Sequence, residues 1–369
     1  MDRFMNTGNK FFLGLPASLL MAAVTLPCAA QSSVQLTGLL DSGVTYLGNQ
    51  GGKSNTYVNN GVMRPSTLVL RGNEELGGGT SAIFYLGTMF SLGTGALLGS
   101  PGTLFTRESY VGLSNEIGTL SVGMQRDFMF DTLSLNGYSG AFYHGWFGSH
   151  QGPFASFGVP YNTQGSIDHD RINGEAVSNA IKFSSKNFSG LSFGALYGFG
   201  ETAGNMSTSN AVSAGVNYEF GNAGVAAVYS KVKYPGFANG TQGIQNAGLG
   251  LKYKFEDMTL ASLYTLSNNT LNKARINTLD LTASYRLTAA WNLASTYTYM
   301  KGNSVLNGDK ANQLAATLSY HFSKSTMIYT SIAHQIASGP KAVARIASAM
   351  GPANGTSQTA VTINLQKIF

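Results

Sequence analysis

Residues 312–322 have the sequence NQLAATLSYHF, with an apolar or aromatic side chain at every second position from Leu314 to Phe322. The positions between them carry no formal charge at neutral pH: Gln313, Ala315, Thr317, Ser319 and His321. Successive side chains of a β-strand point to opposite faces, so this stretch predicts a strand with one apolar and one polar face. Residues 279–287, LDLTASYRL, repeat the pattern. A period of two over about ten residues is typical of a transmembrane strand with lipid on one side and water on the other.

Segments of this kind recur along the chain from residue 33 to the C-terminus. They are expected near 33–47, 62–74, 80–92, 104–114, 118–127, 175–187, 190–200, 210–220, 223–234, 244–255, 258–268, 275–287, 290–301, 311–322, 325–337 and 357–369. Tight turns alternate with longer polar stretches at 48–60, 93–103, 201–209, 235–243, 268–274, 302–310 and 338–356. Short turns on one rim and long loops on the other predict an all-β fold, a 16-stranded antiparallel transmembrane β-barrel with a water-filled lumen.

A soluble β-sandwich would alternate in the same way, but its polar faces would carry more charge. Here only 11% of residues are charged, and the polar faces are mostly Ser, Thr, Asn and Gln. The formal net charge of +6 is spread along the chain without basic runs, so no nucleic-acid partner is indicated. Composition therefore favours the barrel over the sandwich.

The N-terminus has the pattern of a secretory signal peptide over residues 1–30. Arg3 and Lys10 precede an apolar run at 11–26, and small residues follow up to Ala30, where cleavage is expected. The run is 16 residues long, short of the ~20 that a membrane-spanning helix needs. A lipoprotein anchor at Cys28 is disfavoured because Pro27 precedes it. The barrel would then comprise residues 31–369, which contain no cysteine for a disulfide or a thiolate metal site.

Residues 128–174 lack any alternating pattern, and a loop of this length in a compact fold is usually functional. The stretch is crowded with aromatic residues, among them Phe142, Tyr143 and Trp146, with His144 and His150 between them. Two interpretations stay open. The rings pack the loop against the barrel wall, or they line a path that stacks sugars or aromatic solutes.

Four motifs resemble one protein family: LLDSGV at 39–44, LRGNEELGGG at 70–79, RESYVGL at 107–113 and KNFSGL at 186–191. The chain is similar to the trimeric general-diffusion porins of the Gram-negative outer membrane, particularly the betaproteobacterial type. The resemblance implies a homotrimer for passive diffusion of small hydrophilic solutes and ions, with loop 128–174 folded into the lumen. It also implies contact with outer-membrane lipid, lipopolysaccharide and the barrel-assembly machinery, and it implies no cofactor.

In that family, arginines on the wall face acidic side chains on the folded-in loop. Arg107 matches a wall arginine and Arg71 is retained, whereas Thr67, Met124 and Ala176 stand where further arginines are usual. Nearby basic residues that could compensate are Arg64, Arg126 and Arg171, and the loop holds Asp131, Asp168 and Asp170. These changes predict weak selectivity, with anions only slightly preferred because of the net charge.

The chain ends on Phe369 after apolar residues at every second position from Val361 to Leu365, which predicts a terminal strand bearing the assembly signal of a barrel. Two other classes of protein compete with a channel. A barrel enzyme needs a nucleophile or carboxylate pair near a histidine, but His169 lies on a loop between Asp168 and Asp170, where sequence neighbours rarely attain triad geometry. No metal-ligand spacing is present. A surface adhesin would use its loops, which here are moderate in length. We therefore expect a channel without catalytic or metal-binding residues.

Overall fold

The computed structural model describes residues 32–99, 102–161 and 164–369. The predicted signal peptide and its cleavage site lie outside the described residues. Within the described ranges, no helix combines the length and hydrophobicity needed to span a membrane.

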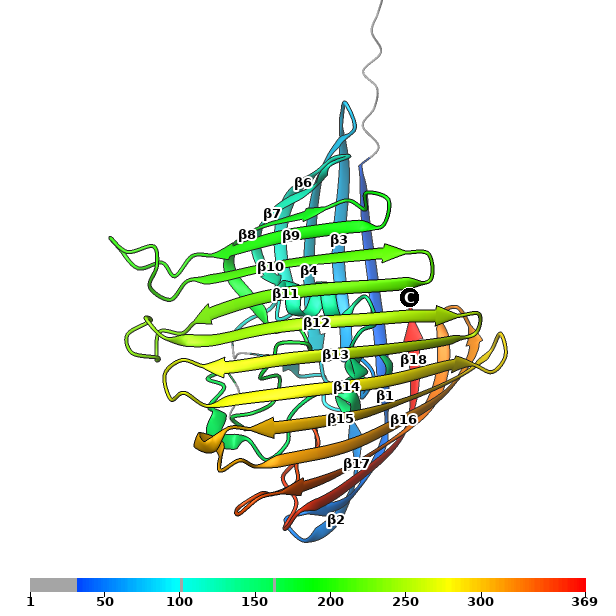
Figure 1. The fold of residues 1–369 in the computed structure, drawn as a ribbon. Helices are drawn as coiled ribbons and strands as arrows, with labels where there is room; N and C mark the ends of the chain where they lie inside the picture. Colours follow the sequence, from blue (N-terminus) through cyan, green and yellow to red (C-terminus); the bar gives the residue numbers. More distant parts are fainter. Residues whose placement is uncertain (1–31, 100–101, 162–163) are drawn as a thin grey trace, which may run out of the picture.

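One antiparallel sheet dominates the structure (Figure 1). Its strands are β1 (Ser33–Gln50), β2 (Lys53–Asn59), β3 (Ser66–Gly77), β4 (Thr80–Phe90), β5 (Leu97–Leu98), β6 (Glu108–Ser114), β7 (Gly118–Arg126), β8 (Ala176–Ser185), β9 (Leu191–Gly198), β10 (Ala211–Phe220), β11 (Ala223–Lys233), β12 (Gly243–Phe255), β13 (Met258–Asn269), β14 (Arg275–Arg286), β15 (Trp291–Gly302), β16 (Lys310–Ser323), β17 (Thr326–Ser338) and β18 (Ser357–Ile368). The sheet closes on itself because β18 pairs with β1, from Leu39 opposite Ile368 to Leu47 opposite Ala360.

Two barrel strands are interrupted, which reconciles these labels with a 16-stranded barrel. Both β2 and β3 pair with β1, the former along its C-terminal half and the latter along its N-terminal half. Likewise β5 and β6 both pair with β4. The break between β2 and β3 spans residues 60–65, where Gly61 has a φ of 86° and Pro65 has no N–H to donate. The predicted closed barrel of 16 antiparallel strands is confirmed.

The prediction of a loop over 48–60 is wrong. Strand β1 continues to Gln50, the chain turns at Gly51 and Gly52, and β2 returns alongside it. Both glycines have positive φ, as tight turns often require. The sequence hid this hairpin because β2, KSNTYVN, is polar on both faces. Two predicted strands, 62–74 and 104–114, begin four residues too early, since β3 begins at Ser66 and β6 at Glu108.

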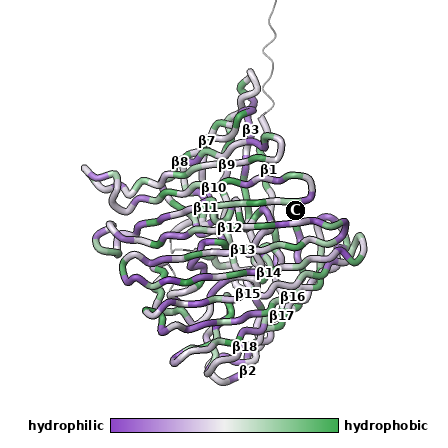
Figure 2. The backbone as a smooth tube through the Cα atoms, viewed as in Figure 1, coloured by the Kyte–Doolittle hydropathy of each residue, from purple (hydrophilic) through white to green (hydrophobic). Residues whose placement is uncertain are grey.

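Side chains alternate between the two faces of the wall as the sequence predicts. On β14, Leu281 is 50% exposed on the outer face, while its neighbours Asp280 and Thr282 are buried inside. Apolar and polar residues alternate along the strands in Figure 2. Aromatic rings cluster at the short turns in contacting pairs, including Tyr218–Phe220, Tyr253–Phe255 and Tyr320–Phe322. Such rings favour the level of the lipid headgroups.

Residues 127–161 and 164–175 lie inside the barrel and carry four short helices, visible within the sheet in Figure 1. They are the π-helix η1 (Met129–Ser134), α1 (Gly140–His144), and the 3-10 helices η2 (Gly145–Gly148) and η3 (Ala155–Phe157). We call this segment the inner loop. Its η1 contacts β10–β12, α1 contacts β14–β16, and η2 contacts β17. The inner loop therefore covers one side of the interior wall.

Glycines make room for the inner loop on that wall. A Cβ at Gly248 would lie 2.3 Å from Leu133 Cδ1, and one at Gly250 would lie 2.6 Å from Cγ of Tyr138. Real Cβ atoms do not approach other atoms this closely, so η1 and the turn after it sit where only glycine fits.

A second connection, residues 339–356 between β17 and β18, also turns inward. The backbone N–H of Arg345 donates to Gln335 Oε1 (2.7 Å), and that of Ile346 donates to Gln358 Oε1 (2.8 Å). The N–H of Gly152 on the inner loop donates to the Arg345 carbonyl at 3.2 Å. The inner loop is thus braced by a second segment as well as by the wall.

Candidate pore constriction

A hollow remains between the inner loop and the opposite wall, formed by β4, β6, β7, β8 and β9. Its lining includes Glu108, Tyr110 and Lys182 from the wall, and Asp131 and Leu135 from the inner loop. In a water-filled channel, charged side chains that line a narrow passage determine which ions pass.

Three arginines lie near one another on the barrel wall, outside the set of residues that line this hollow. Arg107 directly precedes β6, Arg126 ends β7, and Arg64 lies in the break between β2 and β3. The charge of Arg107 acts on both Arg64 and Arg126. The backbone N–H of Arg64 donates to Asp41 Oδ2 (3.1 Å), which fixes the base of its exposed side chain. Two of the predicted constriction residues, Arg107 and Arg126, and the compensating candidate Arg64 therefore form one basic cluster.

The members of this basic cluster differ in how far their charge is balanced. Arg126 is buried, with its guanidinium 4.2 Å from the centre of the Phe130 ring and its Nε donating to the Gly174 carbonyl (3.1 Å). Glu108 lies close enough to offset part of its charge. Among the described residues, neither Arg64 nor Arg107 has a carboxylate within 4.0 Å of its guanidinium. Their charges act on the solution in the lumen.

The other two predicted arginines lie elsewhere. Arg171 is buried, with Nε 2.6 Å from Asp127 Oδ2 and Nη2 2.6 Å from the Glu175 carbonyl, so its charge is cancelled inside the inner loop. Arg71 donates to Gln35 Oε1 (3.2 Å) on β1, and the structure does not bring it into contact with the basic cluster.

The acidic residues of the inner loop are neutralised or enclosed. Asp131 forms an ion pair with Lys182 of β8, a residue that the sequence analysis did not single out. Asp168 is buried and accepts the Asn173 N–H (2.8 Å), and burial raises its pKa well above the usual value. Asp170 is paired with His150. The predicted carboxylates therefore contribute little free negative charge opposite the arginines.

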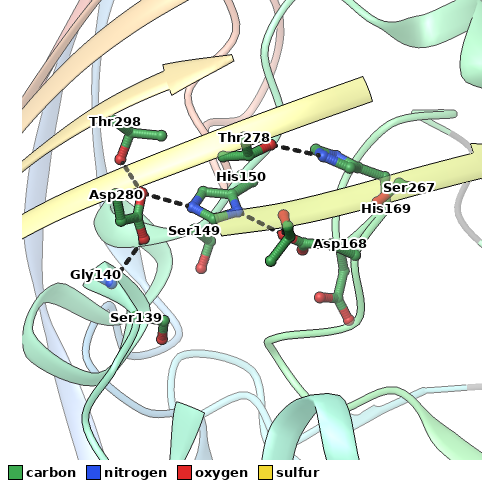
Figure 3. Close-up of polar contacts among 12 residues, drawn as sticks. Ser139, Gly140, Ser149, His150, Asp168, His169, Ser267, Thr278, Asp280 and Thr298 are labelled. Carbon is green, nitrogen blue, oxygen red and sulfur yellow. Dashed lines mark hydrogen bonds and ion pairs between the residues drawn. The ribbon is translucent and has the colours of Figure 1, made fainter. Parts of the chain in front are cut away.

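His150 joins the inner loop to the wall through two carboxylates. Its Nδ1 lies 2.7 Å from Asp170 Oδ2. Its Nε2 lies 2.9 Å from Asp280 Oδ1 on β14, a contact drawn in Figure 3. Burial disfavours the charged imidazole, but Asp280 and Asp170 outweigh it and raise the pKa of His150 well above its ordinary value. Asp280 also accepts the Gly140 N–H (2.9 Å) and the Thr298 hydroxyl (2.7 Å). We call this arrangement the histidine clamp.

Two further histidines meet hydroxyls of the same wall. His144 contacts Thr317 Oγ1 through Nδ1 (2.8 Å) and Thr296 Oγ1 through Nε2 (3.0 Å). Burial lowers its pKa to about 4, so it is neutral at pH 7. His169 Nε2 lies 3.5 Å from Thr278 Oγ1. All three histidines hold the inner loop against β14–β16, and none is free to face the hollow.

The aromatic residues of the inner loop divide between the two interpretations. Phe147, Phe154 and Phe157 are at most 1% exposed and pack the loop together. Phe142 is 40% exposed, although it belongs to a segment inside the barrel. Tyr143 and Trp146 are partly exposed. Packing thus accounts for the first group, while the second borders the aqueous lumen.

Phe369 takes part in barrel closure. It exchanges two backbone hydrogen bonds with Gly38 of β1, at 2.9 and 3.0 Å. A Cβ at Gly38 would lie 2.3 Å from Phe369 Cζ, so the terminal ring covers that glycine. Its role as an assembly signal stays a prediction.

Comparison with known proteins gives the same architecture. Outer membrane porin protein 32 of Delftia acidovorans is 29% identical over 369 residues, covering 95% of this chain and 98% of that protein. An outer membrane porin protein of Bordetella pertussis is 28% identical over 281 residues, 68% of each chain. The solved anion-selective porin from Comamonas acidovorans superposes with a TM-score of 0.76 at 22% identity, covering 92% of this chain and 100% of that one. A trimer form of OmpT of Vibrio cholerae gives 0.63 at 14% identity, covering 92% and 99%.

The family model described as "Gram-negative porin" matches residues 17–339, most of the chain. Its match includes the basic cluster, the inner loop and the histidine clamp. This chain belongs to the Gram-negative porin family.

Proposed function

We propose that this protein is an outer-membrane porin with a distinct preference for anions. Its family and its closed barrel make it a channel of the Gram-negative outer membrane, through which small hydrophilic solutes and ions diffuse passively. The preference is carried by one observation: among the described residues, Arg64 and Arg107 on the wall have no carboxylate in ion-pair distance, while Asp127, Asp131 and Asp170 of the inner loop are each paired with a cation. This goes beyond the slight preference expected from the net charge.

Charge placement explains why two arginines suffice. The lumen is narrow at the inner loop and its wall has a low dielectric constant, so unbalanced charges act strongly on passing ions. Asp131, Asp170 and Asp127 each face a cation within the protein. We therefore expect a positive potential around Arg64 and Arg107, which concentrates anions and repels cations there, with Glu108 offsetting only part of the positive charge of the cluster. The name of the Comamonas relative, an anion-selective porin, agrees with this proposal.

The proposal assigns no catalysis to the buried histidines. A general base needs a free ring nitrogen within reach of the proton that it removes. Both ring nitrogens of His150 face carboxylates, and both of His144 face threonine hydroxyls of the wall. These contacts favour a structural role for both residues.

We further propose a homotrimer that is inserted by the barrel-assembly machinery and is surrounded by lipid and lipopolysaccharide. A trimer form is known for OmpT of Vibrio cholerae, which shares the fold. The apolar outer face of the wall and its aromatic rings at the short turns support insertion in lipid. Chemical cross-linking in detergent, with a threefold mass as the expected product, tests the trimer.

The zero-current potential across a lipid bilayer with a KCl gradient tests the anion preference. We expect its sign to show chloride carrying most of the current. Arg64→Gln and Arg107→Gln should each reduce the potential, whereas Arg275→Gln, an exposed arginine on β14, should leave it unchanged. A potassium-selective wild type, or equal effects of all three variants, would contradict the proposal.

A further inference from the structure

The interior of the barrel presents two chemically different groups near the inner loop. Arg64 and Arg107 lie on the wall side, where they are free of carboxylate partners among the described residues. The inner loop presents Leu135 (51% exposed), which lines the hollow, and Phe142 (40% exposed). Apolar groups exposed in a water-filled interior are costly unless something covers them, and such patches commonly mark binding sites.

The exposed ring of Phe142 is held in a fixed position. Phe142 meets Tyr143 edge to face, with ring centres 5.0 Å apart. The Tyr143 hydroxyl donates to the Gly137 carbonyl (3.1 Å), which anchors the pair to the turn that follows η1. An exposed ring that is held in place can stack a flat solute with little loss of conformational entropy.

The backbone brings the rings and the arginines to one level of the channel. The Trp146 N–H donates to the Val62 carbonyl at 2.9 Å, across the interior from the inner loop to the break between β2 and β3. A Cβ at Gly145 would lie 2.1 Å from the same carbonyl oxygen, so the two segments touch. Arg64 is two residues after Val62, and Phe142, in α1, is four residues before Trp146.

We propose that this constriction binds small aromatic carboxylates, with Arg64 and Arg107 holding the carboxylate and Phe142 and Trp146 contacting the ring. A guanidinium pairs with a carboxylate through two parallel N–H donors, and the aromatic side chains bury the apolar part. Small inorganic anions contact only the arginines of the site, and neutral aromatic solutes contact only its aromatic side chains. The inference rests on the proposed function, since a solute reaches the site through an open, anion-admitting channel.

The test is block of the chloride current through single channels by added solutes. Potassium benzoate should reduce the current at concentrations about fivefold lower than potassium acetate, because only benzoate has a ring to bury. Benzyl alcohol, which has the ring without the charge, should block far more weakly than benzoate. The zero-current potential in KCl, recorded in the same bilayers, separately reports whether the proposed anion channel exists.

Variants assign the two halves of the site. Phe142→Ser and Arg64→Gln should each raise the half-blocking benzoate concentration about threefold or more, while acetate block changes in Arg64→Gln alone. Phe142→Leu keeps an apolar side chain, so its half-blocking benzoate concentration should lie between those of the wild type and Phe142→Ser. Two control variants should leave benzoate block unchanged. They are Phe199→Ser, at a ring of nearly equal exposure (39%) at the end of β9, and Arg275→Gln. Equal block by benzoate and acetate, or an unchanged response of Phe142→Ser, would overturn the proposal even if the channel proves anion-selective.

Discussion

The imidazole of His150 and the carboxylate of Asp280 meet at 2.9 Å, although 130 residues separate them in the sequence. His150 belongs to the inner loop and Asp280 to β14, so this contact joins the part that narrows the channel to the wall that carries it. Asp280 binds α1 at the same time, through the Gly140 N–H. This buried charged pair is therefore one of the contacts that hold the inner loop in place.

Breaking that pair should release the inner loop. Asp280→Asn leaves a buried imidazolium with one carboxylate in place of two, and removal of one partner from a buried ion pair typically costs about 3–5 kcal/mol. We expect a lower temperature of heat unfolding in detergent and larger current fluctuations in single channels. Asp257→Asn removes a partly exposed carboxylate paired with Arg286 and should cost about 1 kcal/mol or less. Asp280→Asn channels with current fluctuations as small as those of the wild type would show that other contacts hold the inner loop.

The histidine clamp should fail at alkaline pH. The folded pKa of His150 is raised above the ordinary value of 6.5, so its contribution to stability is complete below that value and is lost as pH rises through the folded pKa. Current fluctuations should thus be small at neutral pH and grow on the alkaline side. Asp280→Asn removes one of the two carboxylates that raise the pKa, so the onset should move to lower pH. His334→Gln alters a histidine outside the clamp and should leave the onset unchanged.

His144 should make the folded protein less stable at acidic pH, the opposite of the effect of His150. Burial lowers its folded pKa to about 4, whereas the unfolded chain takes up the proton near 6.5. The unfolded state binds more protons in this interval, so stability falls as pH drops from about 6.5 towards 4. We expect His144→Gln, which keeps hydrogen-bonding capacity without a titrating ring, to flatten the pH dependence of the unfolding temperature in this range. An unchanged slope would assign the acid sensitivity to other groups.

The barrel was predictable from sequence because lipid and water impose a period of two on each strand. Residues 279–287 and 312–322 show that period clearly, and the predicted limits of β14 and β16 agree with the structure to within one residue. β2 escaped prediction because its outer face is nearly as polar as its inner face. A strand without an apolar face cannot be told from a loop by periodicity alone.

The constriction was only partly predictable, for a different reason. The resemblance predicts Arg107 as a wall arginine and Arg126 only as a neighbour that could compensate for a missing one, and both adjoin regular strands. The inner loop has no period, and its contacts join distant residues: Arg171 pairs with Asp127, and His150 with Asp280. No local spacing reveals such pairs, so sequence analysis could not show that the loop carboxylates are neutralised.

The glycines under the inner loop should tolerate no side chain. A methyl group at Gly250 would meet the Tyr138 ring at 2.6 Å, and overpacking of this kind typically costs about 1–3 kcal/mol. Gly250→Ala should lower the unfolding temperature or push the inner loop into the hollow, which would reduce single-channel conductance. The matched control is Gly236→Ala, because a Cβ at Gly236 has no atom within 4 Å. Equal behaviour of the two variants would mean that the loop moves aside without penalty.

Phe369 should matter for assembly rather than for conduction. Its backbone closes the end of the β1–β18 seam on Gly38, far along the chain from the basic cluster and the inner loop. Deletion of Phe369 removes both backbone bonds and the ring that covers Gly38, so fewer barrels should reach the outer membrane. The channels that do form should conduct normally and keep their anion preference. Phe322→Ser, at an exposed ring (61%) beside a short turn, controls for loss of one interfacial aromatic. A normal yield of the truncated protein would contradict a role for Phe369 in assembly. A changed conductance of the truncated channels would show that Phe369 also affects the pore.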